Sequence, residues 1–231
     1  MKLLIWDFDG TLGYREGGMW SASLWEVAQR VAPERGLTVD QIRPHLQAGF
    51  PWQTPERPHP DLSDPERWWE AINLTLAAAL RAAGFEEGLA SLAAGQVRAV
   101  YTDPARWRLF EDTRPILQSL SAQGWTHALL SNHVPELPRF LHHLGLSPLL
   151  ALAHNSAQTG YEKPHPRAFQ AVLEAFPEAG PVWMIGDNPV ADVQGAEAVG
   201  IPGILVRRPH PDSRRYAADL AAVAAMVESP A

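Results

Sequence analysis

Two aspartates follow the first apolar run of the chain, in the stretch IWDFDGTLG at residues 5–13. In an extended segment, side chains two residues apart point to the same side, so the carboxylates of Asp7 and Asp9 are expected to lie together. Side by side they repel and raise each other's pKa, and a divalent cation removes that conflict. Mg2+ takes oxygen ligands and prefers one or two carboxylates together with substrate phosphate. The pair therefore indicates a magnesium site.

Other polar side chains stand at comparable places along the chain. Ser131 and Asn132 close the apolar stretch WTHALLS, and Lys163 precedes a predicted helix. Asp187 ends the stretch PVWMIGD and supplies a third carboxylate, and Asp192 lies in the following turn. Open parallel sheets bind ligands at the carboxyl ends of their strands. These residues are therefore expected to share one site with the aspartate pair, with Asp187 among the metal ligands.

The residue types suit phosphoryl transfer. Asp7 can be both metal ligand and nucleophile, forming an aspartyl phosphate. Asp9 can bind the metal through its backbone oxygen, which leaves its carboxyl group free to transfer protons. Lys163 can neutralise charge on the phosphoryl group, and backbone N–H groups at Ser131 and Asn132 can hold non-bridging oxygens.

Apolar stretches and helical periodicity predict the elements that must position this site. Short apolar stretches predict strands at residues 2–6, 125–131, 149–156, 181–187 and 203–208. Helical periodicity predicts helices at 114–124, 135–145, 165–176 and 189–200, and in the alanine-rich stretch 217–231. Strands that alternate with helices indicate an α/β fold with a doubly wound parallel sheet and a Rossmann-like core.

The segment between the first strand and the remaining ones has a different texture. Residues 18–107 carry six of the nine tryptophans, helical periodicity at 21–32 and 65–84, and a proline-rich stretch at 50–65. No strand is expected there. The sequence thus predicts a core formed by residues 1–13 and 109–231, and an inserted, mostly helical cap at residues 14–108.

Composition limits the classes of function. The chain has 231 residues, a formal net charge of -7 and no cysteine, which argues against a nucleic-acid partner and excludes disulfides and thiol chemistry. No apolar run approaches the ~20 residues of a membrane span, and no signal peptide is expected. We expect a cytoplasmic protein with no membrane or nucleic-acid partner. Its oligomeric state cannot be predicted.

Four stretches resemble the ordered motifs of the haloacid dehalogenase-like (HAD) hydrolase superfamily. They are DFDGTL at 7–12, LLSN at 129–132, EKP at 162–164 and GDNPVADVQGA at 186–196. The insertion lies where subfamily I members carry a helical cap. The resemblance implies a Mg2+-dependent phosphatase that hydrolyses a small phosphorylated metabolite through an aspartyl phosphate.

The resemblance also assigns roles to the residues of the first motif. Asp7 resembles the nucleophile, Asp9 the general acid and base, and Thr11 the threonine that supports the phosphate-binding loop. The 2-haloacid dehalogenases of the superfamily lack an acid at the position of Asp9, so Asp9 favours phosphoryl transfer over carbon–halogen cleavage. The stretch between Thr11 and Asp112 contains no lysine, which disfavours a phosphonate hydrolase.

The later motifs supply the remaining roles. Ser131 resembles the phosphate-binding residue of the second motif, with Asn132 beside it, and Lys163 resembles the lysine of the third. Asp187 resembles the Mg2+ ligand of the fourth motif. Asp192 resembles its second acid, which orders the metal's water shell, so the resemblance places Asp192 among the metal-site residues as well. The next position after Asp187 departs from the usual Asp or Ser, because an asparagine stands there.

Three rival functions remain open at this point. A phosphomutase of the same superfamily would carry the same motifs. A receiver-like signalling domain also clusters Asp, Lys and Mg2+, but its phosphoacceptor follows a middle strand and its lysine comes later in the chain. A catalytically silent interaction module is disfavoured by the complete motif set.

Seven histidines are expected to be loop, helix-surface or satisfied core residues: His45, His59, His127, His142, His143, His165 and His210. The cap tryptophans are expected to form core and cap–core contacts, and Trp20 is the one to test as a substrate contact. One of Tyr14, Arg15 and Glu16 is expected to line the pocket.

Overall fold

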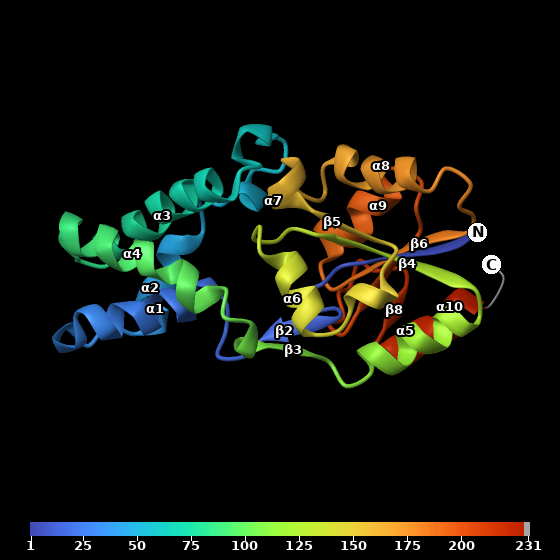
Figure 1. Ribbon diagram of the computed structural model, residues 1–231, viewed down its shortest axis with the longest axis horizontal. Helices are drawn as coiled ribbons and strands as arrows, with labels where there is room; N and C mark the ends of the chain where they lie inside the picture. Colours follow the sequence, from blue (N-terminus) through green and yellow to red (C-terminus); the bar gives the residue numbers. More distant parts are fainter. Residues whose placement is uncertain (229–231) are drawn as a thin grey trace.

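The computed structural model describes residues 1–228 and has a six-stranded parallel sheet at its centre (Figure 1). The strand order is β5-β4-β1-β6-β7-β8, and every neighbouring pair is parallel. The predicted doubly wound α/β fold is therefore confirmed. The strands of the sheet are β1 (Lys2–Trp6), β4 (Trp125–Ser131), β5 (Leu152–Asn155), β6 (Val182–Gly186), β7 (Gly203–Val206) and β8 (Tyr216–Ala217).

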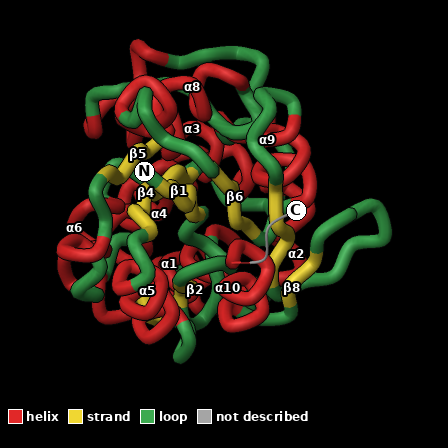
Figure 2. Tube along the Cα trace, turned by 90° about the vertical axis from the view of Figure 1, so that its right-hand side faces the viewer, coloured by secondary structure: helices red, strands yellow, loops and turns green. Residues whose placement is uncertain are grey.

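Helices cover both faces of the sheet because alternate residues of the central strand are apolar on each side. Leu3 and Ile5 of β1 pack with Phe169 on one face, and Leu4 and Trp6 belong to the core on the other. In Figure 2, α8 and α9 lie on one side of the strands, and α5 and α10 lie on the other. These helices are α5 (Thr113–Ala122), α6 (Leu137–His143), α7 (Ser156–Thr159), α8 (Pro166–Ala175), α9 (Gly195–Glu197) and α10 (Leu220–Glu228).

The insertion after β1 forms helices beyond the carboxyl ends of the strands, at the end of the molecule opposite the N-terminus (Figure 1). Asp64 accepts hydrogen bonds from the Glu66 and Arg67 N–H groups, and Pro65 occupies the first helical position, so α3 begins where a cap residue and a proline predict it. The helices are α1 (Trp20–Val31), α2 (Val39–Ile42), α3 (Pro65–Ala82) and α4 (Glu87–Tyr101). Short 3-10 helices occur at Pro33–Arg35, Arg43–Leu46, Pro51–Gln53, Pro60–Leu62, Pro104–Arg106 and Ser147–Leu149.

Two groups of polar contacts, one at His59 and one at Glu136, join this helical segment to the sheet domain. His59 donates its backbone N–H to the Gly160 carbonyl at 2.8 Å, and its ring nitrogen lies 3.0 Å from Glu162. Glu136, at the start of α6, accepts hydrogen bonds from the Trp69 indole at 3.1 Å and from Arg98 at 2.9 Å. The helices are thereby held over the sheet edge at two separate places.

The expectation of no strand between residues 18 and 107 was wrong at Trp107, and it missed a two-stranded antiparallel sheet. Strand β3 (Trp107–Leu109) pairs antiparallel with β2 (Gly13–Arg15), where the chain leaves the sheet domain and returns to it. Each strand has only three residues, which is too short for an alternating pattern to show in the sequence.

The C-terminal half contains two further departures. Strand β8 was not expected, because its two residues carry no strand pattern. The predicted helix at 189–200 begins as a π-helical segment at Pro189–Gln194 and continues as α9. The predicted final helix extends over residues 229–231, which lie outside the described residues. Within residues 1–228, no helix is both long and apolar enough to cross a membrane.

Candidate active site

Asp7 is the centre of a hydrogen-bonded cluster at the carboxyl end of the sheet. It directly follows β1, the middle strand, and its side chain is only 9% exposed. Its Oδ1 atom lies 2.7 Å from Lys163 Nζ and accepts a hydrogen bond from Ser131 at 3.1 Å. The hydroxyl of Thr11 donates to Oδ2 at the longer distance of 3.5 Å. The structure thus brings together residues from three of the four motifs around one carboxylate.

Lys163 is buried and bridges two acids. Its ammonium group donates to Asp7 at 2.7 Å and to Asp192 at 2.6 Å. Burial alone would lower the pKa of Lys163, but Asp192 and Asp7 raise it above its ordinary value, so the side chain stays charged. The amide of Asn132 holds the lysine in place, because it accepts from the Lys163 backbone N–H at 2.7 Å and donates to the Lys163 carbonyl at 2.9 Å.

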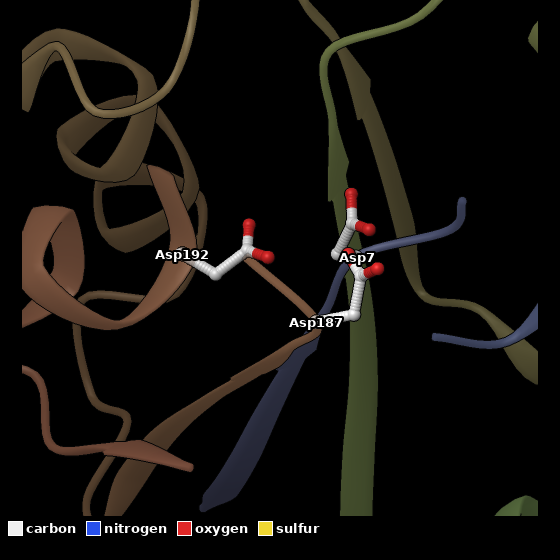
Figure 3. Close-up of side chains that lie close together, drawn as sticks. All are labelled: Asp7, Asp187 and Asp192. Carbon is white, nitrogen blue, oxygen red and sulfur yellow. The ribbon is translucent and has the colours of Figure 1, made fainter. Parts of the chain in front are cut away.

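The acids that follow β6 complete the cluster. Asp7, Asp187 and Asp192 each offer a carboxylate oxygen within 4.8 Å of the others (Figure 3). Burial, together with the charge of Asp7, raises the pKa of Asp187 to about 6. Burial also raises the pKa of Asp192 to about 7, although Lys163 opposes that shift. A Cβ atom at Gly10, which has a φ of +78°, would overlap the Asp187 carboxylate, so only glycine allows this close approach.

Asp9 lies beside this cluster in a different environment. Its carboxyl group is 27% exposed and lies 3.4 Å from His133 Nε2. Burial raises the pKa of Asp9 well above its ordinary value, and the charges of Asp7 and Asp187 add to the effect. A carboxyl group with a raised pKa keeps a proton that it can donate. Burial lowers the pKa of His133 to about 3, so His133 is a neutral neighbour of Asp9.

The four acids and the lysine of this cluster line one end of a cavity of about 440 Å3 between the sheet domain and the helical segment. Met19, Trp20, Trp52, Pro55 and Tyr101 form the opposite wall. The volume is in the range of small-molecule sites. The cavity can therefore hold a small ligand whose one end touches the acidic cluster.

Some of the candidate residues occupy the expected place with a different contact. The side chain of Asn132 is fully engaged with Lys163, so it positions the lysine. The side-chain oxygen of Asn188 accepts from the Val190 and Ala191 N–H groups and caps the π-helical segment. Asp192 uses one carboxylate oxygen for Lys163 and the other for the Asn188 N–H at 2.9 Å.

The pocket candidates from the start of the insertion divide between two hollows. Trp20 lines the main cavity, as predicted. Tyr14 and Arg15 line an adjoining hollow beside Asp9, and Glu16 pairs with Arg108 at 2.8 Å. Trp52 lines the cavity from the proline-rich stretch 50–65. Nothing in the sequence indicates the cavity position of Tyr101 or the contact of His133 with Asp9.

Two histidines also bear on the predictions. His127 accepts from the Trp6 indole at 3.0 Å in the core, which confirms it as a satisfied core residue. His59 lies in the proline-rich loop, as expected, but it is buried against Glu162. Pairing across the domain contact explains that burial, and nothing local in the sequence indicates it.

The donor set fits a divalent cation that prefers oxygen. Three carboxylates converge, and Asp187 accepts no side-chain hydrogen bond within residues 1–228 that would compete for a cation. Asp187, and Asp7 through its Oδ2 atom, which accepts only the long 3.5 Å contact from Thr11, are thus the carboxylates best placed to bind Mg2+ directly. Because both oxygens of Asp192 are engaged, it is placed to orient Lys163 and the turn that carries Asp187.

Comparison of this chain with known proteins identifies the class of protein to which the fold and the acidic cluster belong. A family model of haloacid dehalogenase-like hydrolases matches residues 1–200, so the chain belongs to that family. The superfamily resemblance and the expected hydrolase class are confirmed.

Particular relatives are similar over different parts of the chain. A phosphoserine phosphatase from Thermus thermophilus is 36% identical over 48% of this chain, which spans only 45% of that protein. The mouse haloacid dehalogenase-like hydrolase domain-containing protein 3 is 26% identical over 91% of this chain and 84% of its own length. Among solved structures, the HAD-hydrolase YfnB from Bacillus subtilis, described as bound to magnesium, superposes with a TM-score of 0.72 at 19% identity, covering 99% of each chain. That likeness supports the shared fold.

Proposed function

We propose that this protein is a Mg2+-dependent phosphatase that hydrolyses a small phosphomonoester through an aspartyl phosphate on Asp7. The observation that carries the proposal is the convergence of Asp7, Asp9, Lys163 and Asp187 at one end of a cavity of small-molecule size. The family is one of hydrolases, and relatives named phosphoserine phosphatase and ribulose-1,5-bisphosphate 5-phosphatase support a phosphomonoester as substrate.

The proposed reaction has two steps. In the first, a carboxylate oxygen of Asp7 attacks phosphorus, the bond from phosphorus to the leaving oxygen breaks, and Asp9 gives its proton to that oxygen. In the second, water attacks the phosphorus of the aspartyl phosphate while Asp9 takes a proton from it. Inorganic phosphate leaves and Asp7 is a free carboxylate again. The raised pKa of Asp9 suits the first step, because the carboxyl group begins protonated.

The groups around Asp7 neutralise the negative charge of the phosphoryl group. Lys163 lies 2.7 Å from the nucleophile and can bind a phosphoryl oxygen beside it, and Ser131 and Thr11 donate to the same carboxylate. When bound by Asp7, Asp9 and Asp187, with Asp192 nearby, Mg2+ supplies positive charge for the phosphoryl oxygens. We further propose that residues 14–108 act as a cap that excludes water during the first step and reopens for product release.

The test is phosphate release from a panel of small phosphomonoesters, with Mg2+ and with EDTA. We expect release that requires Mg2+ and is lost in Asp7→Asn. The control is Asp40→Asn, which removes a carboxylate that lies on the helical segment and pairs only with Arg43 at the surface. Conversion of a sugar phosphate to its isomer without phosphate release would instead support a phosphomutase. Mg2+ binding without any turnover would favour a non-catalytic role.

A further inference from the structure

The wall of the cavity that faces the acidic cluster is aromatic and carries no charge. The helical segment contributes Met19, Trp20, Trp52, Pro55 and Tyr101 to it. Burial raises the pKa of Tyr101 well above its ordinary value, with a further contribution from Asp9, so its hydroxyl stays protonated and neutral. The leaving group of a substrate therefore meets an uncharged, largely flat surface.

Contacts with other aromatic rings fix the orientation of the two indoles of this wall, Trp20 and Trp52. Trp20 stacks on Tyr101 with ring centroids 4.0 Å apart and an interplanar angle of 16°. Trp52 stacks on Phe50 at 4.6 Å and 18°. Trp20 also contacts Phe50 and Trp52, so both indoles are packed against other rings and little side-chain freedom remains to be lost when a ligand stacks on the wall.

The indole N–H groups of this wall are free to bind a ligand. Within residues 1–228, neither Trp20 nor Trp52 donates a hydrogen bond, whereas Trp25, Trp69 and Trp107 all do. Both N–H groups can therefore donate to an acceptor atom on a neutral ligand, which adds specificity to stacking.

The cavity lacks a partner for a second anionic group on the substrate. Lys163 is the one cationic side chain among its lining residues, and Asp7 and Asp192 already occupy it. In the adjoining hollow, Arg15 donates to backbone carbonyls and Arg207 pairs with Asp112. Arg208 also lines that hollow and pairs with no acid within residues 1–228, but it is not among the lining residues of the main cavity. A carboxylate or second phosphate placed against the aromatic wall would lose its hydration without gaining an ion pair.

We infer that the substrate is a phosphomonoester whose alcohol part carries a flat, uncharged aromatic or heteroaromatic ring, stacked between the phosphate site and the wall formed by Trp20 and Trp52. This inference rests on the proposed phosphatase function. It distinguishes this protein from phosphatases that act on phosphorylated amino acids, hydroxy acids or bisphosphates, because such enzymes must neutralise a second anionic group of the substrate.

The experiment compares kcat/KM for benzyl phosphate and phosphoglycolate in saturating Mg2+. Both release an alcohol from a CH2–O–P linkage, but one carries a neutral ring and the other a carboxylate. We expect wild type to prefer benzyl phosphate by at least ~10-fold, and Trp52→Ala to lower that value by about 10-fold, the size of one aromatic stacking contact. The value for phosphoglycolate should change about 2-fold at most, because that substrate makes no stacking contact.

Matched variants keep the outcome interpretable. Trp25→Ala removes a half-exposed indole of α1 that does not line the cavity, and both substrates should be unaffected. Trp52→Leu keeps an apolar side chain if the alanine variant does not fold. Arg208→Ala tests the exposed guanidinium of the adjoining hollow, and a specific loss for phosphoglycolate would show an anion subsite there and overturn the inference.

A binding measurement separates this inference from the proposed function. Calorimetry with benzylphosphonate and phosphonoacetate needs no turnover. Trp52-dependent binding of benzylphosphonate without hydrolysis of any ester would uphold the aromatic subsite and defeat the phosphatase proposal. Hydrolysis that prefers phosphoglycolate, or that falls equally for both esters in Trp52→Ala, would uphold the phosphatase and defeat the aromatic subsite.

Discussion

Replacing Lys163 by methionine is expected to destabilise the protein through the carboxylates that it leaves behind. The side chain is 2% exposed and joins Asp7 and Asp192 through contacts of 2.7 and 2.6 Å. Methionine keeps most of the apolar stem but removes the only cation that contacts these acids within residues 1–228. Removing one partner of a buried ion pair costs about 3–5 kcal/mol.

That cost should depend on pH, because Asp192, one of the two acids left without the lysine, can take up a proton. The pKa of Asp192 is already about 7 with the lysine present, and losing the lysine raises it further. At pH 8 in EDTA, Lys163→Met should lower the free energy of unfolding by the full ~3–5 kcal/mol. For a chain of this size the loss corresponds to a fall in Tm of about 6–20 °C. At pH 5 Asp192 is protonated, so the fall should be smaller.

Thermal unfolding followed by circular dichroism measures both values. Lys2→Met is the matched control, since Lys2 is the only other lysine of the chain and lies over the ring of Trp125 at 4.8 Å. A second control places Lys163→Met in an Asp192→Asn background, where one of the two stranded charges is absent and the penalty should shrink. Equal losses at both pH values, or a loss no larger than that of Lys2→Met, would refute the reasoning.

Three further predictions address the proton donor, the metal site and the domain contact. Asp9→Asn should lower kcat by about 10²–10⁴-fold for alkyl phosphates but far less for 4-nitrophenyl phosphate, whose leaving group needs no proton; equal losses for both esters would exclude Asp9 as the acid. Burial raises the pKa of Asp187 to about 6 and that of Asp192 to about 7. The folded state therefore binds more protons than the unfolded chain between roughly pH 4 and 7. As a result, the free energy of unfolding without Mg2+ should fall as pH rises through that window. Mg2+ binds the deprotonated carboxylates and should therefore raise Tm more at pH 8 than at pH 5; the opposite order in a thermal-shift assay would contradict the assignment. Gly160→Ala should lower Tm more than Gly36→Ala, because both glycines have positive φ but only at Gly160 would a Cβ atom clash with the backbone of the proline-rich loop; equal shifts would show that the loop yields.

The parallel sheet explains why much of the site could be predicted from the sequence. Asp7, Ser131 and Asp187 each follow an apolar run, and parallel strands bring such ends to one edge whatever the separation in sequence. Lys163 joins them because the turn before α8 lies at the same edge. The residue types then restrict the chemistry, since carboxylates and one lysine around a cavity suit a cation and a phosphoryl group.

The parts that could not be predicted depend on contacts between distant segments. Trp52 lies in the proline-rich stretch and Trp25 in α1, but nothing local in either segment shows that Trp52 lines the cavity and Trp25 does not. The role of Asn132 emerges only when its amide is seen to pair with the backbone of Lys163, 31 residues later. The burial of His59 likewise depends on Glu162, 103 residues away.

The most direct measurement of the central claim is to trap the covalent intermediate. The protein would be mixed with a substrate and Mg2+, quenched in acid and digested with trypsin, and the peptide of residues 3–15 examined by tandem mass spectrometry. The account predicts the mass of one added phosphoryl group on Asp7 in wild type and none in Asp7→Asn. Phosphate release by wild type with no phosphoryl group on this peptide at any time point, or with the group on another residue, would contradict it.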